Sequence, residues 1–140
     1  MRTNGWEKRF NDVLEAKRKE PFAWGKNDCS LFAADCVKAL TGIDFMKELR
    51  GLYASEEEAE AIIGYTGSLE RTIENLLWPI HPVNICVTNA KRGDVVMVEL
   101  GKKLAVGVWD GQDALVPTPK SECGFGKYPM RCVVRCWGIV

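Results

Sequence analysis

The chain has 140 residues, of which 46% are hydrophobic, and its nineteen lysines and arginines balance nineteen aspartates and glutamates. This length and this apolar fraction suit one compact domain, residues 1–140, with a substantial core. Because the formal net charge is zero, no overall field attracts a nucleic-acid backbone, so nucleic acid is not an expected partner.

No apolar run is long enough to span a membrane, and the first residues lack the apolar core of a signal peptide. These features predict synthesis in the cytoplasm, where thiols stay reduced, so the six cysteines are expected to be mostly free. With one histidine and no C-x-x-C motif, the chain is expected to need no metal or other cofactor.

Two helices are predicted in the first part of the chain. Trp6, Phe10, Val13 and Leu14 recur at helical spacing and indicate an amphipathic helix that ends before Pro21. The apolar spacing of residues 31–40 predicts a second helix that begins at Cys29 and stops at Gly42.

Cys29 has two interpretations. The unpaired peptide N–H groups at a helix start carry partial positive charge, so a thiol there ionises more easily and is a candidate nucleophile. Cysteine is also among the most buried residue types, and a thiol beside Leu31 and Phe32 equally suits packing.

The middle of the chain predicts two short helices without a catalytic constellation. Residues 55–58, Ser-Glu-Glu-Glu, form a capping box that starts one helix, and Gly64 is expected to end it. Ser68 starts the next, with an apolar stripe through residue 77. The only histidine, His81, follows in a proline-bracketed connector, where a solvent-facing role is the ordinary one and a catalytic base the alternative.

From about residue 92 the hydrophobic period changes from helical to β-type. Strands are predicted over residues 95–100, 104–109, 113–116 and 131–140, with an irregular surface loop over 117–129. On the last strand, Cys132, Val134 and Cys136 are expected to share a face.

The second strand predicts a small-residue face. Alternation places Leu104, Val106 and Val108 on one side and Ala105, Gly107 and Trp109 on the other. A strand needs small side chains where a helix backbone approaches closely, so we expect the helix that begins at Cys29 to pack on the Ala105 side.

Three segments together resemble a known family. Residues 24–32, Trp-Gly-Lys-Asn-Asp-Cys-Ser-Leu-Phe, are similar to the nucleophile segment of NlpC-type cysteine peptidases, papain-like enzymes that cut cell-wall peptides. Residues 92–96, Arg-Gly-Asp-Val-Val, and 105–109, Ala-Val-Gly-Val-Trp, resemble the two strands that follow in that family. The match is closer still to a branch of small phage-encoded proteins of the superfamily.

The resemblance implies an α+β, papain-like fold, with N-terminal helices packed on a C-terminal antiparallel sheet. It places Cys29 at the nucleophile position, while the position of the family histidine falls on Ala105. We therefore expect the Cys29 sulfur to lie near the Ala105 methyl group and His81 to lie much farther away.

The lost base predicts a catalytically relaxed domain, because amide cleavage needs a general acid as well as a thiolate. By its resemblance to the phage branch, the protein is expected to be a structural or assembly component of a phage tail, near the tip. Its partners would be other tail proteins, and it would move from the host cytoplasm into the virion.

Two alternatives remain open. An active cysteine hydrolase, a cell-wall peptidase or amidase, would use Cys29 as nucleophile with His81 or a residue of a neighbouring chain as base. A thiol or metal module would use Cys123, Cys132 and Cys136.

Overall fold

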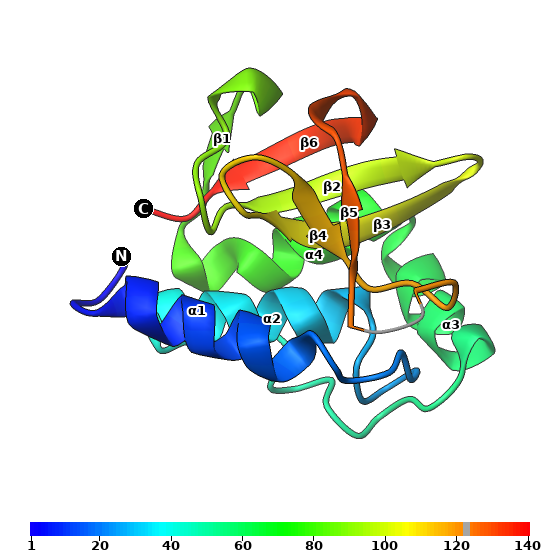
Figure 1. Cartoon of the computed structure of the whole chain (residues 1–140). Helices are drawn as coiled ribbons and strands as arrows, with labels where there is room; N and C mark the ends of the chain where they lie inside the picture. The colour runs from blue at the N-terminus through cyan, green and yellow to red at the C-terminus, as the bar shows by residue number, and fades with distance from the viewer. Residues whose placement is uncertain (122–123) are drawn as a thin grey trace.

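The structure of the protein, a computed structural model, describes residues 1–121 and 124–140. Within these residues, helices fill the first half of the chain and the strands of one antiparallel sheet lie in the second, so the expected α+β class is confirmed (Figure 1). No helix of the described residues has both the length and the apolar character needed to cross a membrane.

The helices follow the predicted order closely. Their bounds are α1 Trp6–Lys17, α2 Cys29–Thr41, α3 Glu56–Thr66 and α4 Leu69–Leu77, with short 3-10 turns η1 Trp78–Ile80, η2 Val87–Asn89 and η3 Met130–Cys132. The expected stop at Gly64 is wrong: α3 continues to Thr66, and Gly67 ends it, with its N–H group bonded to the carbonyl of Ile63. Gly64 is tolerated inside the helix because a mid-helix glycine costs only about 1 kcal/mol.

The strands form one six-stranded sheet in which every neighbouring pair is antiparallel, in the order β1-β6-β2-β3-β4-β5. Their bounds are β1 Val83–Ile85, β2 Val95–Leu100, β3 Lys103–Trp109, β4 Ala114–Val116, β5 Gly126–Tyr128 and β6 Val133–Gly138. Strands β1 and β5 were not predicted, and the expectation of an irregular segment over 117–129 is wrong where β5 pairs with β4.

The predicted alternation along the last strand fails at a β-bulge. Met97 pairs with Arg135, but the next residue of β2, Val98, pairs with Val133, so β6 carries one extra residue. Val134 is therefore exposed, and Val133 turns to the same side as Cys136. Cys132 lies in η3, before the strand begins.

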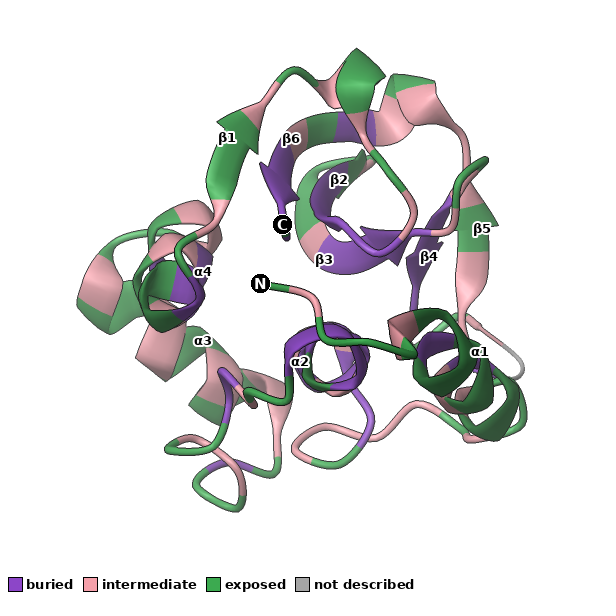
Figure 2. Cartoon of the chain, turned by 90° about the vertical axis from the view of Figure 1, so that its left-hand side faces the viewer, coloured by how far each residue is buried: buried purple, intermediate pink, exposed green. Residues whose placement is uncertain are grey.

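Two clusters of buried side chains lie on opposite faces of the sheet. The helix-side core joins α1 and α2 to one face, through residues such as Phe10, Phe32, Val106 and Val108. The far-side core covers the other face and includes Trp109 and the strand residues Val96, Val98, Ala114, Val116, Val133 and Cys136. Figure 2 shows the sheet as a strongly curved layer, with α2 on the outside of the curve.

The expected packing face of α2 is wrong. The helix packs on the Val106 and Val108 side of β3, whereas the Ala105 and Gly107 side faces the far-side core. Gly107 is small for a different reason: a Cβ built on it would lie 2.1 Å from the carbonyl oxygen of Leu115 in β4. The close approach at this strand therefore comes from the neighbouring strand and not from a helix.

A buried carboxylate ties the two ends of the chain to the sheet. Asp94, which is 2% exposed, accepts hydrogen bonds from the backbone N–H groups of Lys91 and Ile139 at 2.8 and 3.0 Å. The Arg2 guanidinium donates to the same side chain at 3.1 Å. Asp94, in the Gly-Asp pair before β2, thus has a structural role, because each oxygen of its buried carboxylate accepts a hydrogen bond.

Candidate functional site

Cys29 is the first residue of α2, as the sequence predicts. The helix is capped by Asp28, whose carboxylate oxygen accepts a hydrogen bond from the Leu31 backbone N–H at 3.0 Å. Gly42, in the left-handed region at φ 80°, closes the other end. A side-chain cap of this kind satisfies one of the unpaired donors of a helix start.

The second oxygen of Asp28 is held from outside the helix. It accepts from the Gly25 backbone N–H at 3.0 Å and from the Tyr53 hydroxyl at 2.6 Å. Burial, followed by the hydrogen bond to Asp28, raises the pKa of Tyr53. With three donors on its two oxygens and 2% exposure, Asp28 is a structural acid and is not aimed at a ligand.

The residues before Asp28 form a tight loop. Gly25 lies at φ 79°, and a Cβ built on it would be 2.1 Å from the Tyr53 carbonyl oxygen, so both conformation and space require glycine. Asn27 is buried and donates its side-chain amide to the carbonyls of Glu20 and Pro21, each at 3.1 Å. The folding of the loop thus accounts for Gly25, Asn27 and Asp28 in this run.

The Cys29 thiol lies at the junction of the two cores. It is half-buried, packs against both clusters, and accepts a hydrogen bond from the backbone of Val106 in β3. Burial raises the pKa of the Cys29 thiol and the Asp28 carboxylate raises it further, although hydrogen bonds from Val106 and Ser30 oppose the shift. Burial thus acts against the easier ionisation that the helix start was expected to give, because loss of hydration disfavours the thiolate.

Ala105 precedes Val106 on β3 and is half-buried. Its side chain packs against the far-side core, and so does that of Cys29. The residues on either side of it in β3, Leu104 and Val106, cannot titrate, so this part of the strand offers no proton to a leaving group.

His81 lies elsewhere. It is exposed, adopts a left-handed conformation at φ 56°, and stands between η1 and the edge strand β1. In the sheet order, β1 is three strand spacings from β3. Strands β6 and β2 therefore lie between the strand that follows His81 and the strand that carries Ala105.

The structure describes two of the three cysteines proposed for a metal or thiol module, and both pack in the far-side core. Cys123 lies outside the described residues, Cys132 is half-buried in η3, and Cys136 is fully buried in β6. Burial raises the pKa of Cys136 to about 12. Among the residues that the structure describes, no three His, Cys, Asp or Glu side chains lie close enough to hold a metal ion.

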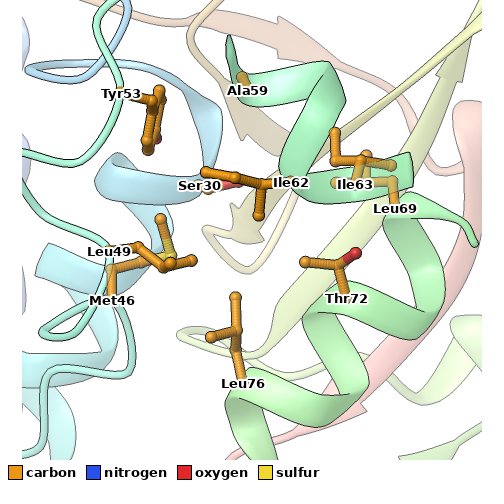
Figure 3. Close-up of a pocket in the computed structure, with 10 residues that line it drawn as sticks. All are labelled: Ser30, Met46, Leu49, Tyr53, Ala59, Ile62, Ile63, Leu69, Thr72 and Leu76. Atoms are coloured by element: carbon orange, nitrogen blue, oxygen red, sulfur yellow. The ribbon is translucent and has the colours of Figure 1, made fainter. Parts of the chain in front are cut away.

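A hollow that the sequence did not predict opens beside the Cys29 loop. Figure 3 shows apolar side chains of α3, α4 and the segment 46–53 around the hollow, with Ser30 near the middle of the view, beside Ile62. A second hollow of about 440 Å³ continues it outward and shares Leu49, Ile62, Thr72 and Leu76. No periodic signal reports such a space, because its walls come from three separate segments.

Comparison with known proteins gives one match. No curated protein and no solved structure matches the chain. A family model described as a domain of unknown function, DUF6950, matches residues 1–139. Since this match spans nearly the whole length, the chain belongs to the DUF6950 family.

Proposed function

We propose that the protein is a catalytically relaxed member of the NlpC-type, papain-like superfamily that serves as a structural or assembly component of a phage tail, near the tip. The order of the resembling segments supports the fold part of this proposal. A cysteine begins a helix, that helix packs on an antiparallel sheet, and the Gly-Asp strand and the strand with Ala105 follow.

One observation carries the non-catalytic reading. The Cys29 thiol meets β3 beside Ala105, where the family has its histidine, and burial raises the pKa of that thiol. A cysteine hydrolase needs a thiolate near neutral pH and an acid that protonates the leaving amine. The only histidine is three strands away, so neither need is met within the described chain.

The tail assignment rests on the resemblance to phage-encoded proteins, with fold analogy as its warrant. Its implied partners are other tail proteins, and the implied route runs from the host cytoplasm to the virion.

The test separates assembly from catalysis. In the phage that encodes the gene, a stop codon at this position of the genome should yield defective tails, whereas Cys29→Ser should yield normal particles and titre. Purified wild-type protein should leave a cell-wall tetrapeptide intact. Peptide cleavage that Cys29→Ser abolishes would replace this proposal with the cysteine hydrolase, and normal tails with the stop codon would remove the assembly role.

A further inference from the structure

Asn4 is followed by Gly5, and the two residues form the only Asn-Gly pair in the sequence. Such a pair is prone to deamidation, because the nitrogen of a glycine, with no Cβ beside it, can approach the asparagine side chain closely. Both residues are exposed. Neither the Asn4 side chain nor the Gly5 N–H group has a hydrogen-bond partner among the described residues, so no contact occupies the reacting groups.

The reaction needs only water as a second reactant. The Gly5 nitrogen loses its proton and attacks the Asn4 Cγ, the bond from Cγ to the side-chain nitrogen breaks, and ammonia leaves. Water then opens the five-membered succinimide ring at one of its two carbonyls. Opening at Cγ gives aspartate, and opening at the main-chain carbonyl gives isoaspartate, in which the chain runs through Cγ. Nothing is oxidised or reduced, and either product carries one negative charge more than the neutral chain.

In the folded chain the two reacting atoms point apart. The Trp6 N–H group donates to the Thr3 carbonyl at 3.2 Å, Gly5 lies at φ 79° and ψ 14°, and Asn4 has no positive φ, which together define a type II turn. The second residue of such a turn has ψ of about +120°, so the Gly5 nitrogen lies on the Hα side of Asn4, away from its Cβ. The peptide group between them must rotate before the ring can close, and a glycine permits this because both signs of φ are open to it.

The Arg9 guanidinium opposes this rotation. Its Nη1 donates at 2.8 Å to the Asn4 carbonyl oxygen, which moves when the peptide group turns. Its other nitrogens donate to the carbonyls of Ala39 at 2.9 Å and Thr3 at 3.3 Å, so the guanidinium is fixed both to α2 and to the turn. The reactive conformation is therefore reached only when the bond between Arg9 and Asn4 is broken.

We propose that Asn4 is a modification site, at which the folded chain deamidates spontaneously to aspartate and isoaspartate, and that Arg9 slows the reaction by holding the Asn4 carbonyl. The new carboxylate lies just before α1, where the unpaired N–H groups of the helix start favour negative charge. This inference goes beyond the proposed function and depends neither on Cys29 nor on the tail assignment.

The test follows the modification with time in mildly alkaline buffer. The full chain and a synthetic peptide of residues 1–9 are incubated side by side, and liquid chromatography with mass spectrometry separates the aspartate and isoaspartate products after digestion. Asn4 should react before every other asparagine of the folded chain, at a rate at least about threefold below that of the peptide, because the peptide lacks the fixed turn. Asn4→Gln should remove the acidic species from isoelectric focusing, because its longer side chain would have to close a six-membered ring.

Two variants of α1 test the role of Arg9. Arg9→Gln removes the bond to the Asn4 carbonyl and should raise the deamidation rate about three- to tenfold, the factor that one net hydrogen bond represents. Lys8→Gln removes the same charge from an exposed neighbour that pairs with Asp12, and should change the rate less than twofold. Circular dichroism verifies that both variants are folded, and the comparison of wild type with the peptide needs no variant.

Three results would overturn the proposal. These are an Asn4 that stays intact in the folded chain after the peptide has reacted to completion, a folded chain that reacts as fast as the peptide, or a rate that Arg9→Gln leaves unchanged or lowers.

Discussion

Asp28 joins two parts of the chain that are 25 residues apart. Its carboxylate receives the Tyr53 hydroxyl at 2.6 Å as well as two backbone N–H groups. Tyr53→Phe removes only the hydroxyl and leaves one oxygen of a buried carboxylate short of a donor, which costs about 1–3 kcal/mol of unfolding free energy. Urea denaturation measures this loss.

The matched control is Tyr65→Phe. Tyr65 is 94% exposed, so the same chemical change there should leave the denaturation midpoint in place. Equal effects of the two substitutions would mean that the bond between Tyr53 and Asp28 contributes nothing to stability.

The environment of Cys29 makes a prediction about pH. Because burial raises the pKa of this thiol, its alkylation by iodoacetamide should still be accelerating above pH 9 in the folded protein, in a background where the other reactive cysteines are serine. In denaturant the rate should level off near the ordinary thiol pKa, about 8.5.

Ala105→His should reverse that behaviour in part. An imidazole beside the sulfur can take its proton, and the resulting cation favours the thiolate, so the alkylation rate at pH 7 should rise by about tenfold, corresponding to one pKa unit. Val134→His, at an exposed position of β6, is the control. A rate unchanged by Ala105→His would place residue 105 too far from Cys29 for the nucleophile–base geometry of the NlpC-type peptidases that the chain resembles.

At the scale of elements, the loop between α1 and α2 requires glycine at position 25 for two separate reasons. Gly25→Ala introduces both a strained φ and a Cβ 2.1 Å from the Tyr53 carbonyl, whereas Gly51→Ala introduces a similar φ, 81°, with no atom within 4 Å. The Gly51 substitution should cost about 1 kcal/mol, and the Gly25 substitution clearly more, because the backbone must shift. Similar midpoints in urea would show that the contact with Tyr53 yields easily.

The elements differ in how much the sequence reveals of them. Helix α2 and strand β2 bury continuous or periodic apolar side chains, so their bounds follow from the pattern. Strands β1 and β5 have three residues each and lie at the sheet edges, where partly exposed side chains leave no alternation to read. The bulge in β6 is equally hidden, since one extra residue changes pairing without changing composition.

In the candidate site too, the local features were predictable from the sequence and the long-range contacts were not. A cysteine at a helix start is local and was predictable from Asp28 and the helical spacing. The hydrogen bond between Asp28 and Tyr53 and the hollow between α3, α4 and residues 46–53 were not predictable, because both depend on where the irregular segment 43–54 folds back. The wrong face for α2 has a related cause: Gly107 signals a close neighbour but does not say which element supplies it.

For the whole molecule, the two cores allow stability without covalent bridges. The five described cysteines are all unpaired, and the sixth, Cys123, lies outside the described residues. Calorimetry with and without reductant should give the same Tm to within about one degree. A disulfide contributes about 2–4 kcal/mol, so a fall of roughly ten degrees on adding reductant would reveal one.

Each of the two cores contains a buried cysteine, and the reactivity of that thiol reports how often its core is exposed to solvent. Cys36 belongs to the helix-side core and Cys136 to the far-side core, and both are fully buried. Under native conditions each can be alkylated only while its own layer is open, so the two labelling rates measure two opening equilibria. Equal rates would mean that the layers on either side of the sheet come apart in one concerted event, and unequal rates would reveal which layer yields first.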